Sequence, residues 1–257
     1  MKFRPCIDIH NGKVKQIVGS SINDNGDNAV ENFVSGKDSV YYAKMYKNDG
    51  LTGGHIIQLN SADSEYYQDT RNQAVMALEA YSGGMQAGGG INAENAGYFL
   101  DKGASHVIVT SYVFSNGEIN YDNLRKISRA AGKENLVLDL SCRKKDGDYY
   151  IVTDRWQRFS NVTVDEKILN ELSSYCDEFL IHAVDVEGKA SGIEEELVLK
   201  LGKWDGIPIT YAGGISGYND ILKLKEYGNG RIDFTIGSAL DIFGGSISYK
   251  DIVSEFG

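Results

Sequence analysis

The chain has 257 residues, 42% of them hydrophobic, with 26 basic and 36 acidic side chains for a net charge of −10. This length suits one α/β domain over residues 1–257, and the acidic balance excludes a broad basic surface for nucleic acid or an anionic membrane. The N-terminal segment lacks signal-peptide features, no apolar run is long enough to cross a membrane, and three cysteines without a CxxC pair fit a reducing cytoplasm.

Eight short apolar segments recur along the chain, separated by longer segments with helical patterning such as residues 72–82 and 218–228. Apolar runs without strict alternation are typical of parallel strands buried on both faces. Eight strands alternating with helices in a chain near the ~250 residues of a (βα)8 barrel predict that fold, with an open doubly wound sheet as the alternative. The segments are FRPCIDI (3–9), HIIQLN (55–60), MQAGGGI (85–91), HVIVTS (106–111), LVLDLS (136–141), FLIHAV (179–184), IPITYAGG (207–214) and DFTIGSA (233–239).

Two segments are additions to the minimal set of strands, helices and short loops that a (βα)8 barrel needs. Residues 19–36 are polar and rich in Gly and Asn, which predicts a long mobile loop that acts as a lid. Residues 143–156 contain a Lys-Asp-Gly turn followed by the strand-like YYIVT, which predicts a hairpin inserted after the fifth strand.

The glycine-rich segments occur in two matched copies. AGGGI (87–91) matches YAGGI (211–215), and at similar spacing beyond them IVTSYVF (108–114) matches TIGSALDIF (235–243). We therefore interpret the chain as two duplicated half-barrels, each of four βα units.

Each copy predicts a phosphate-binding site, because exposed backbone N–H groups and a helix N-terminus attract phosphate. The alternative is that the glycines only form tight turns. Two facing sites predict a ligand with a phosphate at each end. The candidate phosphate-binding residues are Gly88, Gly89, Gly90, Thr110 and Ser111 in the first half, and Gly213, Gly214, Gly237 and Ser238 in the second.

Two aspartates occupy related positions in the half-repeat, Asp8 in CIDIHNGK and Asp139 in VLDLSCRK. Each lies near the end of an apolar strand, where an unpaired carboxylate is costly to bury and where barrel enzymes place catalytic groups. Two facing carboxylates can divide general acid and general base work. The structural alternative is that each aspartate is bonded to a nearby N–H group or lysine.

Four more side chains belong to the predicted mouth of the barrel. His182 ends the sixth apolar segment, and Asp185 and Glu187 follow it as groups that would orient a substrate. Trp156 follows the predicted hairpin, where it would either stack on a flat heterocycle or fill a hydrophobic gap beneath the hairpin. No histidine has metal-ligand spacing, so we predict no metal site.

Together, PCIDIHNGKV, QAGGGI, VIVTSYVF, LDLSCRK, YAGGIS and IGSAL resemble the histidine-biosynthesis isomerases of the HisA/HisF superfamily, in their eukaryotic-type branch. The resemblance covers nearly the whole chain. It implies a (βα)8 barrel of duplicated halves, a bis-phosphorylated small-molecule substrate, an Amadori rearrangement of an aminoaldose to an aminoketose, and no metal or redox cofactor. We also expect the protein to be a monomer.

The resemblance assigns roles to four residues. Asp139 matches a general acid that opens the ribose ring by protonating its oxygen, and Asp8 matches a base that takes the proton from C2 of the resulting Schiff base. His182 falls where the family has Thr or His on the sixth strand. Trp156 matches a tryptophan that packs on the aminoimidazole.

This sequence departs from the bacterial pattern at two places, with QLN (58–60) in place of Asp-Leu-Asp and Asn92 in place of Arg. The sister cyclase is one alternative function, but its pattern predicts a Lys where this chain has Gln16. A barrel that binds sugar phosphates without catalysis is the other alternative, and two carboxylates facing an anionic ligand argue against it.

Overall fold

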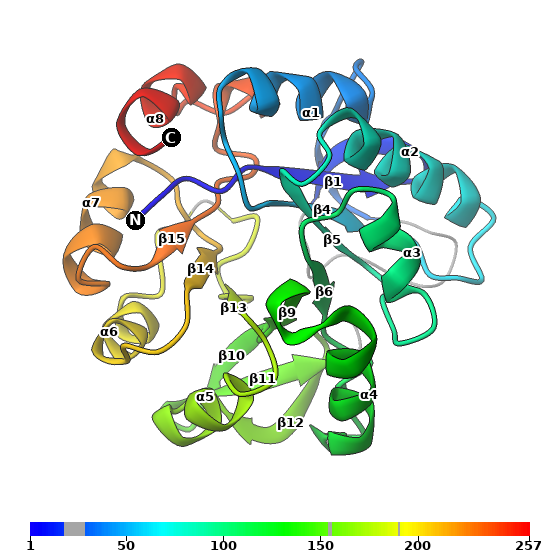
Figure 1. Ribbon diagram of the computed structural model, residues 1–257. Coiled ribbons are helices and arrows are strands. Elements are labelled where there is room, and N and C mark those ends of the chain that lie inside the picture. The colour runs from blue at the N-terminus through cyan, green and yellow to red at the C-terminus, as the bar shows by residue number, and fades with distance from the viewer. Residues whose placement is uncertain (18–28, 154–155, 190) are drawn as a thin grey trace.

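The computed structural model describes residues 1–17, 29–153, 156–189 and 191–257. Eight parallel strands follow one another in chain order, and helices surround them (Figure 1). Each strand overlaps one of the eight apolar segments, so these strand predictions are confirmed. The strands are β1 (Cys6–His10), β4 (Gly54–Gln58), β5 (Met85–Gly88), β6 (Val107–Val109), β9 (Leu136–Asp139), β13 (Glu178–His182), β14 (Ile209–Ala212) and β15 (Asp233–Phe234).

Four of the helices begin where the sequence supplies a capping side chain. Asp38 accepts a hydrogen bond from the backbone of Tyr41 at 2.9 Å, and Asn120, Asp165 and Ser248 cap later helices in the same way. Most of residues 72–82 and 218–228 are helical, as predicted. The helices are α1 (Ser39–Asn48), α2 (Tyr67–Ala80), α3 (Ala96–Asp101), α4 (Tyr121–Ala131), α5 (Glu166–Leu172), α6 (Glu195–Lys203), α7 (Tyr218–Tyr227) and α8 (Tyr249–Phe256), with short 3-10 turns η2 (Lys133–Asn135) and η3 (Asp241–Phe243). None of the helices in the described ranges has the length and apolar character that a membrane span requires.

The parallel sheet curls until its last strand meets the start of the chain. Phe3 forms a parallel bridge with Phe234, the Arg4 amide donates to the Phe234 carbonyl at 2.8 Å, and the Phe234 amide donates to the Lys2 carbonyl at 3.0 Å. Sequential strand order with joined ends is the arrangement of a (βα)8 barrel and not of an open doubly wound sheet. A cluster of Ile108, Val137, Leu180 and Ala212 comes from four neighbouring strands.

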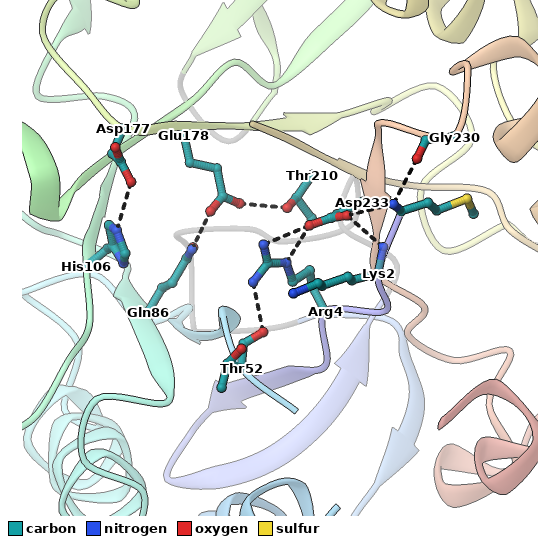
Figure 2. A network of polar contacts seen from close by, with 11 residues as sticks. Lys2, Arg4, Thr52, Gln86, His106, Asp177, Glu178, Thr210, Gly230 and Asp233 are labelled. Atoms are coloured by element: carbon teal, nitrogen blue, oxygen red, sulfur yellow. Dashed lines mark hydrogen bonds and ion pairs between the residues drawn. The ribbon is translucent and has the colours of Figure 1, made fainter. Parts of the chain in front are cut away.

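Polar side chains link the strands at the amino ends of the barrel (Figure 2). Arg4 Nε donates to Asp233 Oδ2 at 2.8 Å, which ties the start of the chain to β15. Glu178 accepts from Gln86 Nε2 at 2.9 Å and from Thr210 Oγ1 at 2.6 Å, so its buried carboxylate is bonded on both oxygens. Because catalytic groups in barrels lie at the opposite end, this network serves stability.

Residues 31–34 form strand β3 (Glu31–Val34), which pairs antiparallel with β2 (Lys13–Ile17). The prediction that all of residues 19–36 form a mobile loop is therefore wrong for this part. A strand forms here because β2 offers a free edge, Glu31 pairs with Lys15, and Phe33 packs on Phe243 at a ring distance of 5.8 Å. Residues 19–28, which carry most of the predicted lid, lie outside the described residues.

The predicted hairpin after the fifth barrel strand is confirmed as β10 (Cys142–Lys145) and β11 (Asp148–Thr153). Asp146 and Gly147 form its turn with φ of 52° and 92°, the left-handed conformation that tight hairpin turns require. A third strand, β12 (Arg158–Thr163), extends the sheet beyond the prediction. A further short hairpin pairs β7 (Phe114–Ser115) with β8 (Glu118–Ile119).

Candidate active site

One cavity at the carboxyl ends of the barrel strands brings together eight of the predicted site residues. The two aspartates come from different strands, Asp8 from β1 and Asp139 from β9, and the histidine ends β13. These eight predicted residues are among those that line the cavity: Asp8, Asp139, Trp156, His182, Gly213, Gly214, Gly237 and Ser238.

The other predicted site residues, Gly88, Gly89, Gly90, Thr110 and Ser111, are not part of the cavity lining in the described structure. Thr110 Oγ1 donates to Asp139 Oδ2 at 3.2 Å, so its hydroxyl supports the aspartate. Gly89 has φ of 93°, and a Cβ there would lie 2.0 Å from the Gln58 carbonyl oxygen. The alternative explanation, that these glycines only form tight turns, is therefore sufficient to explain why residue 89 is glycine.

The carboxylate of Asp139 is surrounded by donors. Oδ1 accepts from Ser141 Oγ at 2.8 Å and lies 3.2 Å from His182 Nδ1, while Oδ2 accepts from Thr110. Burial by itself would raise the pKa of Asp139, but the charge and hydrogen bond of His182 and the two hydroxyls hold it below its usual range. In the unliganded protein Asp139 is therefore ionised.

The proton of this pair resides on His182. Burial opposes a charged imidazole, but the Asp139 carboxylate raises the pKa of His182 to about 9. The Trp156 ring lies above it at a centroid distance of 5.9 Å, and the His55 ring lies 6.3 Å away on β4. Trp156 thus lines the cavity, as the stacking alternative requires.

Asp8 lies in a different environment. Burial, and then the negative charge of Glu187, raise the pKa of Asp8 to about 7. Gln16 donates to its Oδ2 at 3.3 Å. The general acid and base roles would require a protonated Asp139 and an ionised Asp8, but the pKa shifts of the two aspartates run the other way. The acidic proton beside Asp139 is on His182, and the pKa of Asp8 is near neutrality.

Glu187 and Asp185, both expected to orient a substrate, have separate surroundings. Glu187 lines the cavity, burial raises its pKa, and its buried Oε2 has no hydrogen-bond partner among the described residues. Asp185 instead accepts from Arg143 Nε at 2.7 Å and from the Lys144 amide at 2.9 Å. Asp185 therefore secures the inserted hairpin, and Glu187 is the one of the two that lines the cavity.

Gln16 and His55 also line the cavity, although neither was among the predicted site residues. His55 begins the second apolar segment, and burial together with the charge on His182 lowers its pKa to about 3, so it is neutral. Gln16 follows the first strand in a segment without strong apolar patterning. Only the pairing of β2 with β1 brings it over the mouth, which local sequence signals do not reveal.

The departures from the bacterial pattern have structural explanations. Asn60 Oδ1 accepts from the Asn11 amide at 2.8 Å and from Thr70 Oγ1 at 2.7 Å, joining the β1–β2 turn to α2. Asn92 Oδ1 accepts from the amides of Glu94 and Asn95, which shapes the turn before α3. Within the described ranges, no cluster of three or more His, Cys, Asp or Glu side chains is arranged to hold a metal ion.

Comparison with known proteins extends over nearly the whole chain. Residues 2–248 match the family described as histidine biosynthesis protein. A Medicago truncatula protein named 1-(5-phosphoribosyl)-5-((5-phosphoribosylamino)methylideneamino)imidazole-4-carboxamide isomerase HISN3, chloroplastic, is 53% identical over 258 residues, covering 99% of this chain and 81% of that protein. Isomerases of the same name from Yarrowia lipolytica and Saccharomyces cerevisiae are 42% and 41% identical, covering 98% and 96% of this chain and 96% and 94% of theirs. The chain therefore belongs to the histidine biosynthesis protein family.

Proposed function

We propose that this protein is the histidine-biosynthesis isomerase that its relatives are named for, converting a bis-phosphorylated aminoaldose to an aminoketose. The observation that carries the proposal is the pair Asp8 and Asp139, which line one cavity of a family barrel in opposite electrostatic environments. Acid and base roles require such a division.

Ring opening is the first chemical step. The Asp139–His182 pair carries one proton between two groups 3.2 Å apart and delivers it to the ribose ring oxygen. The bond between C1 and the ring oxygen breaks, and the amino nitrogen supplies the electron pair that forms the Schiff base. Because Asp139 is ionised in the unliganded protein, the proton comes from His182, directly or through Asp139.

Proton removal from C2 is the second step. Asp8 takes this proton, the C–H electrons form the C1–C2 double bond of an enaminol, and the C1–N double bond becomes single. The enaminol then tautomerises to the aminoketose, so no electrons leave the sugar. A base with a pKa of about 7 is matched to neutral pH, where it is partly ionised and still able to accept a proton.

The two substrate phosphates bind at two separate sites in this proposal. Gly213, Gly214, Gly237 and Ser238 support one phosphate site, since they line the cavity after β14 and β15. Gly88, Gly89, Gly90, Thr110 and Ser111 form the other site after β5 and β6. Binding energy from both phosphates would hold the ribose between the aspartates.

We also infer that the barrel arose from two duplicated halves. Gly89 and Gly90 follow β5 with φ of 93° and 68°, and Gly213 and Gly214 follow β14 with φ of 120° and 76°. Asp8 and Asp139 lie on the first strand of each half. Matched backbone conformations at matched sequence positions support a shared origin.

Three further properties complete the proposal. The protein acts as a monomer in the cytoplasm and needs no metal or redox cofactor, because the rearrangement only moves protons and electrons within one sugar. Light scattering measures the mass in solution and so tests the monomer, and cell fractionation tests the cytoplasmic location. Turnover after treatment with a chelator tests whether a metal is needed. A relative named as chloroplastic makes location the property most in need of measurement.

The proposed function is tested by turnover of the aminoaldose, coupled to a glutaminase–cyclase that consumes only the ketose. Wild type should turn over, and Asp8→Asn and Asp139→Asn should each lose activity while keeping the folded circular-dichroism spectrum. Asp177→Asn is the matched control, since this aspartate lies at the amino ends of the strands. It should retain activity.

Inactivity of folded wild type would overturn the isomerase. The ketose with ammonia would then test the cyclase, and binding of both compounds would test a non-catalytic barrel. Gln16 beside Asp8, where the cyclase pattern predicts Lys, weighs against the cyclase.

A further inference from the structure

We propose that Gln16 is a positioning residue for Asp8, whose side-chain amide orients the carboxylate and favours its ionised form. The inference rests on the proposed function in taking Asp8 as the base. Gln16 itself need not touch the substrate for this role.

A turn after the first barrel strand places Gln16. Asn11 and Gly12 have φ of 51° and 69°, and they reverse the chain so that Val14 of β2 pairs with Ile9 of β1. Two residues further along β2, Gln16 lines the cavity with only 5% of its surface exposed. A long polar side chain so deeply buried needs hydrogen-bond partners.

Its partners are the residues around the proposed base. Gln16 Nε2 lies 3.3 Å from Asp8 Oδ2 and 3.7 Å from Cys6 Sγ. The Cys6 thiol in turn donates to the Ile236 carbonyl at 3.7 Å, so its sulfur is oriented to accept from the amide. Both contacts place the amide NH2, and not its oxygen, against Asp8.

The other side of the amide rests on a glycine. A Cβ at Gly237 would lie 2.3 Å from Gln16 Oε1, so a larger residue there would displace the amide from this position. Gly237 therefore has a reason to be glycine beyond phosphate binding. The amide therefore lies between Asp8 on one side and Gly237, in the loop that follows β15, on the other.

The charged groups that face Asp8 across the cavity have opposing effects on its pKa. Burial and Glu187 favour a protonated Asp8, and His182 favours an ionised one. Asp139, the remaining carboxylate of the cavity, is paired with His182. Gln16 is the direct neutral donor that favours the ionised form.

The titratable groups packed beneath and beside Asp8 are neutral or paired. Burial raises the pKa values of Cys6 and Tyr46 well above their usual ranges, and His55 is neutral with a pKa of about 3. Lys15, the neighbour of Gln16 on β2, is paired with Glu31. None of these groups replaces the donor that Gln16 supplies.

The test compares Gln16→Leu, which removes the donor, with Gln16→Glu, which replaces it with an acidic group of the same length. The acidic limb of kcat/KM reports the pKa of the base in the free enzyme. We expect it to move upward by about one pH unit in Gln16→Leu and further in Gln16→Glu. Gln86→Leu is the matched control, because it also removes an amide donor to a buried carboxylate but at the opposite end of the barrel. Its acidic limb should stay in place.

A second readout does not depend on activity. Titration of Asp8 by carboxyl-carbon NMR should show the same upward shift in both Gln16 variants. An unmoved pKa in these variants would overturn the inference, as would a rise in KM with the acidic limb unchanged, which would make Gln16 a ligand contact. If wild type has no isomerase activity, the NMR shift still decides whether Gln16 positions Asp8. If one variant does not fold, the other gives the result.

Discussion

His182 Nδ1 lies 3.2 Å from Asp139 Oδ1, and this contact determines where the cavity holds its acidic proton. The carboxylate stabilises the imidazolium, whose pKa is raised to about 9, and the imidazolium keeps the carboxylate ionised. The proposed acid is thus a pair of residues and not an isolated carboxylic acid.

Replacing His182 by Asn removes the proton carrier while keeping a polar side chain. We expect kcat/KM to fall by about 10²- to 10⁴-fold, the usual contribution of a general acid. His106→Asn is the control, because His106 pairs with Asp177 at the amino ends of the strands (Figure 2). Activity within a few-fold of wild type in His182→Asn would contradict the assignment.

The pH dependence of kcat/KM should be bell-shaped. Asp8 must be ionised, so activity falls as the pH drops below its pKa of about 7. His182 must be protonated, so activity falls as the pH rises above its pKa of about 9. Initial rates at low substrate across this range measure both limbs. A profile that stays flat through both values would refute these roles.

Glu187→Gln should move the whole bell to lower pH. The negative charge of Glu187 raises the pKa values of both Asp8 and His182, so its removal lowers both. Glu178→Gln is the control, since this buried glutamate lies at the other end of the barrel and is bonded to Gln86 and Thr210. Should both variants shift the limbs equally, the effect would come from general destabilisation.

Asp233→Ala should weaken the closure of the barrel. Its carboxylate accepts from Arg4 and from the Lys2 amide, and the side chains of Arg4 and Asp233 are only 16% and 12% exposed. Its loss therefore leaves a largely buried guanidinium without a carboxylate to balance its charge. We expect the free energy of unfolding to drop by about 2–4 kcal/mol, as urea denaturation would measure. Asp122→Ala removes an exposed pair with Arg125 and should change stability little. Equal effects of the two variants would contradict this account.

Gly214→Ala should be destabilising by about 1–3 kcal/mol. Gly214 has φ of 76°, and a Cβ there would lie 2.1 Å from the Gly192 carbonyl oxygen. Gly217→Ala is the matched control, since no atom lies within 4 Å of a Cβ at that position. Thermal unfolding distinguishes the two, and an unchanged melting temperature in Gly214→Ala would show that the loop adapts without strain.

Much of the fold was accessible from sequence because parallel strands carry a strong local signal. Each barrel strand overlaps a continuous apolar segment, and the Asp146–Gly147 turn was marked by its residue types. Strand β3 was missed because Glu31–Val34 has little apolar patterning, and it forms only because β2 offers an edge. Tertiary pairing outweighed local propensity there.

Site residues could be predicted from the sequence where a polar side chain follows an apolar strand, because barrel enzymes place catalytic groups there. Asp8, Asp139 and His182 were predicted in this way. The structure brings all three into one cavity, and their catalytic roles stay predictions. The residues of the first predicted phosphate site, Gly88 to Gly90 with Thr110 and Ser111, do not line that cavity in the described structure, so this site stays a prediction.

The sequence by itself determined the order of strands and helices, the strand-end positions of the two aspartates and the turns that glycine permits, because these depend on residues close together in the chain. Only the tertiary structure decided the protonation of the site. The contact of His182 with Asp139, the placement of Glu187 near Asp8, and the approach of Gln16 over Gly237 each join residues from different strands or loops. Burial and charge set a pKa through distance in space, which spacing along the chain does not specify.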